Sequence, residues 1–309
     1  MHFGRVLPHE IDEIDFTLAP DPLLTVQTLQ AAGKAEQPRV FMGCPVWGSK
    51  PWIGKMYPAR TKDSECLDHY VQHFNTIELN ATHYKIYDAA TIAKWTAKAK
   101  DRPFVFCPKV PQAISHYSNL ASRQASDLTD EFLQSILHFK QHLGPVFLQL
   151  SEQFSPGQLG TLLTYLEAWP RDMPLFVEVR HLQWFADKRV RDTYFLALKK
   201  LNIGAVLTDT SGRRDAVHME LTVPKAFIRF VSNSDHPSNY TRLDAWVERI
   251  GQWLRAGLQE LYFFVHNPDD LLSPELSDYF ARQLNHHCHT QLTLPLFISG
   301  EQAIQQSLF

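Results

Sequence analysis

The sequence predicts an α/β protein of the TIM-barrel-like (β/α)8 class, and three observations lead to this fold. Short runs rich in β-branched and apolar residues alternate with amphipathic helical runs along most of the 309 residues. The first turn, 43–48, lacks the G-x-G-x-x-G spacing expected of the competing doubly wound sheet. No internal repeat or low-complexity segment interrupts the alternation.

Each predicted element is a run bounded by turn residues or by a change of hydrophobic period. We expect strands at 40–43, 76–80, 104–109, 146–150, 175–180, 205–209, 226–230 and 261–266. We expect helices near 64–74, 89–100, 127–143, 156–169, 187–201, 242–256 and 273–287. The connection at 210–225 has the weakest helical pattern, so it is the least regular of the predicted units.

The chain divides into an N-terminal extension at 1–38, a single TIM-barrel-like domain at 39–290 and a C-terminal tail at 291–309. Within the extension, Leu23, Val26 and Leu29 have helical spacing, and Gly33 marks the stop.

Composition narrows the functional classes. With 44% hydrophobic and 20% charged residues, the chain is typical of a soluble globular protein. Its formal charge of −3 without a long basic run does not favour nucleic acid as a partner. It has neither a signal-peptide core nor a membrane-length apolar run, which predicts a cytoplasmic protein without a membrane partner. Its cysteines lack C-x-x-C spacing, so we expect four free thiols, Cys44, Cys66, Cys107 and Cys288.

The stretch 174–181 is the most informative one. Leu175, Val177 and Val179 share one strand face, while Glu178 and Arg180 share the other face with Phe176. Charges within an apolar strand need a partner or a ligand, because burying them unpaired costs several kcal/mol, roughly.

The same alternation directs polar residues of the other strands inward, late in each strand. The C-terminal ends of parallel barrel strands form the mouth where substrates bind, so these residues should surround one cavity. They are Glu78, Lys109, Gln149, Glu178, Arg180, Asp209, Arg229 and His266. The alternative is an internal ion-pair network whose members only satisfy one another.

Within this group we assign catalysis to carboxylates, since a carboxyl group in a partly apolar cavity acts as a general acid or base. The candidates are Glu178, Glu78 and Asp209. The other candidates bind substrate, and the aromatic ones lie in loops where they suit ring stacking. They are Lys109, Gln149, Arg180, His181, Arg229, Trp47, Tyr84, Trp184, His266 and Asn267.

No cofactor or metal is predicted. Glu178, His181, Asp209 and His266 are of the types that hold Zn²⁺ or Mn²⁺, but no H-E-x-x-H or comparable motif supports such a site. The run 286–289, His-His-Cys-His, has no second ligand pair at zinc-finger spacing.

Several ordered motifs resemble the bacterial family known as domain of unknown function 72, the YecE-like proteins. They are the segments 43–48 with Trp52, 73–84, 109–111, 143–150 and 177–181 with Trp184. The resemblance spans roughly 40–285. It implies a TIM-barrel-like fold and an unassigned activity.

We therefore expect an enzyme, a hydrolase being one class, that uses carboxylate acid/base chemistry on a small anionic or polyhydroxylated substrate. One alternative is a metal-dependent phosphodiesterase, as some TIM-barrel nucleases are, which rests on fold analogy alone. The other is a barrel that binds a ligand without changing it.

Overall fold

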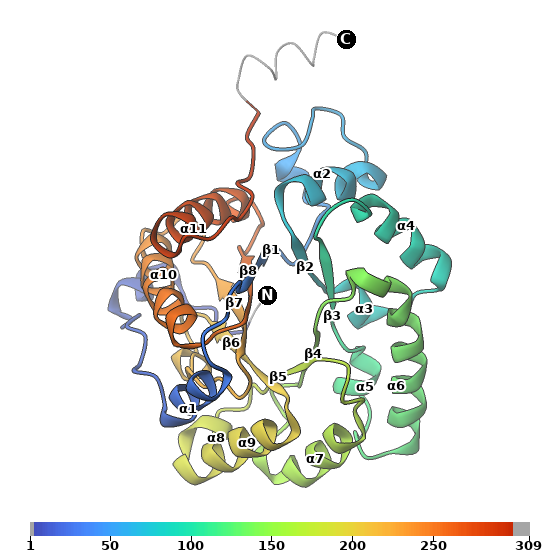
Figure 1. Cartoon of the computed structure of the whole chain (residues 1–309), viewed down its shortest axis with the longest axis vertical. Coiled ribbons are helices and arrows are strands. Elements are labelled where there is room, and N and C mark those ends of the chain that lie inside the picture. The colour runs from blue at the N-terminus through green and yellow to red at the C-terminus, as the bar shows by residue number, and fades with distance from the viewer. Residues whose placement is uncertain (1–2, 299–309) are drawn as a thin grey trace.

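A computed structural model describes residues 3–298 and shows an α/β fold with a mostly parallel central sheet (Figure 1). All predicted strands are present within those residues, with bounds that differ by at most two positions. They are β1 (Arg39–Gly43), β2 (Thr76–Leu79), β3 (Val105–Pro108), β4 (Val146–Gln149), β5 (Leu175–Glu178), β6 (Gly204–Asp209), β7 (Lys225–Val231) and β8 (Glu260–His266).

The strands form two parallel sheets. Six strands pair in the order β1-β8-β7-β6-β5-β4, and β2 pairs with β3. Single parallel bridges, Phe106 to Leu143 and Lys109 to Phe147, connect β3 to β4 and its preceding loop. Between β1 and β2, the side chain of Asn75 takes the place of a strand ladder: it accepts from Met42 N and donates to Val40 O, both at 2.8 Å.

Helices surround the central strands (Figure 1), and the longer ones lie near the ranges that hydrophobic periodicity predicts. Asp88, Ser122 and Asp187 accept backbone N–H bonds at the starts of α4, α6 and α9, which fixes these boundaries. The principal helices are α2 (Cys66–His73), α4 (Ala89–Ala99), α6 (Arg123–Ile136), α7 (Leu159–Ala168), α9 (Lys188–Leu201), α10 (Ser238–Ala256) and α11 (Ser273–Cys288). Three shorter ones are α3 (Ala81–Tyr84), α5 (Gln112–Ser115) and α8 (Gln183–Ala186).

The connection between β6 and β7 contains only the short 3-10 helix η6 (Arg214–Ala216) within the described residues. Its weak helical pattern is consistent with this. Ahead of β1 lie the 3-10 helix η1 (Pro8–Glu13) and α1 (Leu23–Ala32), which ends at Gly33 as predicted. Residues 1–2 of the predicted extension and 299–309 of the predicted tail lie outside the described residues.

Two apolar clusters follow from the alternation of side chains along the strands. The larger one packs one strand face against the helices. The smaller one, here called the strand cluster, consists of Phe41, Cys107, Phe147, Phe176, Val206, Val223, Phe227, Tyr262 and Phe264. It lies beneath the polar residues described next.

Between residues 3 and 298, every helix is too short or too polar to cross a membrane.

Candidate functional site

Polar residues follow the strand cluster toward the C-terminal ends of the strands. Side chains two positions apart on a strand share a face, and six of the cluster residues are followed on the same face by a polar one. The pairs are Cys107 and Lys109, Phe147 and Gln149, Phe176 and Glu178, Val206 and Thr208, Phe227 and Arg229, and Phe264 and His266. The result is a polar layer on an apolar floor.

Arg229 is the centre of this layer. Its guanidinium donates from Nε to Oε2 of Glu78 at 2.8 Å and from Nη2 to Oε1 of Glu78 at 2.9 Å. Its Nη1 donates to Oε2 of Glu178 at 2.7 Å. All three side chains are buried, with Arg229 1% exposed and Glu78 0% exposed. Arg229 therefore links β2 to β5 across the layer.

Glu178 holds a second arginine, since Arg180 Nε donates to its Oε1 at 2.6 Å. Burial by itself raises the pKa of Glu178, but Arg180 and Arg229 outweigh burial and lower that pKa to about 2. Burial likewise raises the pKa of Glu78, but Arg229 and His266 lower it well below its ordinary value. Both carboxylates are ionised at neutral pH and hold arginines in place.

His266 contacts Glu78 from β8, with 2.9 Å between Nε2 and Oε2. Burial lowers the pKa of His266, and Glu78 only partly opposes this, so the imidazole is neutral at neutral pH. An ionised carboxylate is only an acceptor, so Nε2 carries the proton and donates it to the bond.

Lys109 is a buried amine beside this network, 7% exposed. Its Nζ donates to Oε1 of Gln149 at 3.1 Å and lies 5.8 Å from the centre of the Phe147 ring. Burial and the nearby Arg229 lower the pKa of Lys109, Glu78 and Glu178 oppose them, and the result is a pKa of about 7. Within residues 3–298, no carboxylate forms an ion pair with this amine.

These groups open into a cavity of about 500 Å³. Its polar lining comes from β2, β3, β4, β5, β7 and β8 and the loops that follow them, and the predicted residues in it are Lys109, Gln149, Arg180, Arg229, Tyr84, His266 and Asn267. Tyr84 stands at its edge with 73% of its surface exposed. Asn267 is buried and donates from Nδ2 to Ser232 Oγ at 2.7 Å. Glu78 and Glu178 are not among the lining residues; they bond to Arg229, which is.

Three of the predicted binding residues, Trp184, Trp47 and His181, are not among the residues that line this cavity. Trp184 is fully buried, donates from its indole N–H to Phe154 O at 2.7 Å, and packs against Tyr194. It offers no face for stacking, so that prediction is wrong: the residue serves the packing of α8. Trp47 packs edge-on against Trp95. His181 accepts the Gln183 N–H at Nδ1 in the loop after β5, at 3.3 Å.

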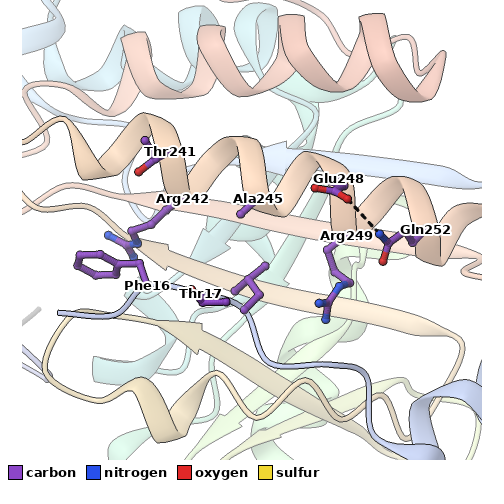
Figure 2. Close-up of a pocket in the computed structure, with 9 residues that line it drawn as sticks. Phe16, Thr17, Thr241, Arg242, Ala245, Glu248, Arg249 and Gln252 are labelled. Carbon is purple, nitrogen blue, oxygen red and sulfur yellow. Dashed lines mark hydrogen bonds between the residues drawn. The ribbon is translucent and has the colours of Figure 1, made fainter.

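The inward orientation predicted for Asp209 is also wrong. Its carboxylate accepts from Trp246 Nε1 at 2.8 Å and pairs with Arg242 at 2.9 Å, both on α10, and with Arg214. Burial raises the pKa of Asp209, but Arg242 and Arg214 outweigh it and lower the pKa. Figure 2 shows the Arg242 side chain on α10 with its guanidinium beside the Phe16 ring. Asp209 thus anchors a helix rather than lining the cavity.

The error comes from β6, which is buried on both faces. The residues at 205–207 are all apolar, so the sequence did not indicate which face of this strand points inward. Val206, not Leu207, belongs to the strand cluster, and therefore Thr208 faces the polar layer. Thr208 Oγ1 is buried and has no hydrogen-bond partner within the described residues.

Three polar lining residues, Asn80, His83 and Asp270, were not among the predicted site residues. Asn80 donates from Nδ2 to Glu78 Oε1 at 2.9 Å, and its place two positions after Glu78 was the available sequence signal. His83 lies in α3, where its Nδ1 is 2.9 Å from Val110 O. Burial, together with Lys109, lowers its pKa to about 4. In the sequence, only the position of His83 shortly after a strand could have indicated that this residue lines the cavity.

The residue types that could hold Zn²⁺ or Mn²⁺ do not come together within the part of the chain that the structure describes. Among residues 3–298, no three side chains of His, Cys, Asp or Glu lie close enough together to hold one ion. Asp209 in particular faces α10, away from Glu178 and His266.

Comparison with known proteins places the chain in a family. The model of the family described as "Protein of unknown function DUF72" matches residues 41–296. The UPF0759 protein YecE of Escherichia coli (strain K12) is 29% identical over 255 residues, which cover 77% of this chain and 89% of that protein. UPF0759 protein YunF of Bacillus subtilis (strain 168) is 25% identical over 152 residues, covering 48% of this chain and 52% of that protein.

Solved structures agree on the fold. A DUF72 family protein from Enterococcus faecalis has a TM-score of 0.61 at 16% identity, covering 83% of this chain and 100% of its own. One from Thermotoga maritima has a TM-score of 0.58 at 19% identity, covering 80% of this chain and 99% of its own. With the family match over 41–296, the chain is a member of the DUF72 family.

Proposed function

We propose that this protein is an enzyme acting on a small anionic substrate in the cavity beside Lys109, with Lys109 as the proton-transfer group. The observation that carries the proposal is the buried Lys109 amine, which lines the cavity and donates to a neutral side chain, Gln149, at 3.1 Å, with no carboxylate paired to it among residues 3–298. An amine with a pKa near the working pH is suited to general acid and base catalysis.

The surroundings of Lys109 favour an anionic substrate over an uncharged, polyhydroxylated one: Asp270 also lines the cavity, but within residues 3–298 it forms no ion pair with Lys109. Glu78 and Glu178 are matched in number by Arg180 and Arg229, and the bonds from Arg229 to Glu78, from Arg229 to Glu178 and from Arg180 to Glu178 are 2.6–2.9 Å long. Lys109 adds one further cation when protonated. An anion in the cavity would supply a charged partner for Lys109, and Arg180 lies in the same lining.

Carboxylate acid/base chemistry fits the geometry less well. A carboxylate whose pKa is near 2, as for Glu178, is a weak base and is not protonated at neutral pH. We assign Glu178 and Glu78 to positioning Arg180, Arg229 and His266. The proton-transfer role passes to Lys109.

The site also fits a closed TIM-barrel-like arrangement, which we include in the proposal. The bridges between Lys109 and Phe147 and between Phe106 and Leu143, and the bond from Glu78 N to Cys44 O at 3.2 Å, support closure between the two sheets. In such a barrel the C-terminal strand ends carry the active site.

The proposal is tested by titrating Lys109 directly. In protein labelled with ¹³C-lysine, the Lys109 Cε resonance, assigned by its loss in Lys109→Arg, should report a pKa of about 7. Inorganic phosphate should raise this pKa by about one unit or more, because an anion stabilises the ammonium form. An ordinary lysine pKa that does not respond to phosphate would overturn the proposal.

Turnover separates an enzyme from a barrel that only binds. Small phosphate esters and carboxylic acids would be incubated with wild-type protein and with Lys109→Arg, and the mixtures analysed by mass spectrometry. We expect conversion of at least one compound by the wild type alone. Binding to Lys109 without conversion of any compound would support the non-catalytic alternative.

Replacing Lys109 by methionine should stabilise the fold. The folded-state pKa of about 7 lies below the ordinary 10.5, so the folded protein binds fewer protons than the unfolded one between these values. Stability therefore rises with pH across that window, and the full penalty is present below it. Lys109→Met removes the penalty, and we expect roughly 2–4 kcal/mol more stability at neutral pH and much less gain at high pH.

Urea unfolding at neutral and alkaline pH measures the effect. Lys140→Met, at an exposed lysine, is the matched control and should change stability little at either pH. A loss of stability in Lys109→Met would show that the amine is paired in the folded state.

A further inference from the structure

An N-terminal strap, residues 3–16, lies against the loops at the C-terminal ends of the strands and precedes the family-matched segment 41–296. Its Phe3 ring is 5% exposed. The centre of that ring is 4.3 Å from Cζ of Arg180 and 4.8 Å from Cζ of Arg213. The strap therefore covers an arginine of the cavity.

Gly4 anchors the strap. Its carbonyl oxygen accepts from Gly212 N at 2.8 Å and from Thr210 Oγ1 at 3.0 Å, in the loop after β6. Its φ of +67° is one that L side chains rarely adopt, and a Cβ here would lie 2.3 Å from Thr210 Cγ2. Only glycine fits this position without displacing the strap.

Phe16 fixes the other end of the strap. Its ring lies 5.0 Å from Cζ of Arg242 (Figure 2) and 5.2 Å from Cζ of Arg214. These two arginines pair with Asp209. The ion pairs around Asp209 thus help to hold the strap that carries Phe3.

We propose that the strap is a working part of the site, with Phe3 as a positioning residue that orients Arg180 for an anionic substrate. The inference rests on the proposed function. The guanidinium of Arg180 is held at Nε by Glu178 at 2.6 Å and is covered by the Phe3 ring. An aromatic ring over a guanidinium excludes water from that face and strengthens the interactions that the group makes in its plane.

The test measures phosphate affinity from the shift of the Lys109 Cε resonance in the full-length protein. Phe3→Ala should weaken phosphate binding roughly 3- to 30-fold, the range of a cation–π contact. Gly4→Ala, which displaces the strap through Thr210, should weaken it at least as much. The control is Leu7→Ala, at a strap residue that is 58% exposed, and it should bind phosphate like the wild type. Circular dichroism confirms that each variant is folded.

A reciprocal measurement separates positioning from a purely structural role. If the strap strengthens phosphate binding, phosphate must hold the strap closed by the same factor. The Gly212 amide, which donates to Gly4 O, should then exchange with solvent more slowly when phosphate is bound to the wild type.

The outcomes are distinct. Equal phosphate affinity in the wild type and Phe3→Ala, or a Gly212 amide that exchanges at the same rate with and without phosphate, would overturn the role of Phe3 and leave the proposed function standing. A wild-type Lys109 that does not respond to phosphate would overturn the proposed function, and the role of Phe3 with it.

Discussion

Replacing Arg229 by methionine is expected to lower the free energy of unfolding at neutral pH by about 3–5 kcal/mol. The guanidinium makes three hydrogen bonds of 2.7–2.9 Å to Glu78 and Glu178. Its removal leaves Glu78, which is 0% exposed, with His266 and Asn80 as neutral donors, and leaves Glu178 with Arg180. An uncompensated buried carboxylate is among the most costly defects in a fold.

The pH dependence of this loss has a definite sign. In the wild type, Glu178 has a folded-state pKa near 2, below the ordinary 4.5, so its stabilisation is present above pH 4.5 and is lost toward pH 2. In Arg229→Met the carboxylates have higher pKa values and become neutral on mild acidification. The difference between the two proteins should therefore shrink when urea unfolding is repeated near pH 4.5.

Arg39→Met is the matched control. Arg39 also pairs with a glutamate, Glu260, but its side chain is 65% exposed, so we expect a loss of less than about 1 kcal/mol. If Arg229→Met cost no more than this control, the network would not contribute to folding as described.

Replacing Asp209 by asparagine is expected to lower the free energy of unfolding by about 3–5 kcal/mol while leaving the Lys109 pKa unchanged. The substitution removes the charge that faces Arg242, which is 2% exposed, and weakens the bond to Trp246 Nε1. Because the carboxylate faces α10 and does not line the cavity, its role is to join that helix to β6.

Urea unfolding and the Lys109 Cε titration measure the two parts of this prediction separately. Asp192→Asn, which removes a carboxylate that pairs with the exposed Lys188 on α9, should cost little stability. A changed Lys109 pKa in Asp209→Asn would show that the Asp209 carboxylate acts on the cavity, contrary to this prediction.

Local patterns were sufficient for the elements of this fold. The strand β5 follows from a short apolar run that is buried at every position, and the helix α10 follows from period 3.6 because it buries one face. The same reasoning brought Glu178, Arg180 and Arg229 to one layer. Glu178 and Arg180 share a strand face with Phe176, and Arg229 shares one with Phe227; both phenylalanines belong to the strand cluster.

Contacts between distant segments account for the errors. In β6 both faces are apolar, so the orientation of Asp209 depended on Arg242, which lies on another element. The sequence places Trp184 in a loop, but its indole N–H donates to the carbonyl of Phe154 and its ring is buried. Phe3 belongs to a segment without periodicity, so the cations it covers depend on where the strap crosses the molecule.

The junction between β3 and β4 has a mechanical consequence. Across it the backbone makes single bridges instead of a continuous ladder within the described residues, at Phe106 and at Lys109. Lys109 and Gln149 stand on opposite sides of this seam and are joined by one bond of 3.1 Å. A ligand that binds both side chains would add a second connection between β3 and β4. Binding in the cavity would then make this junction more rigid.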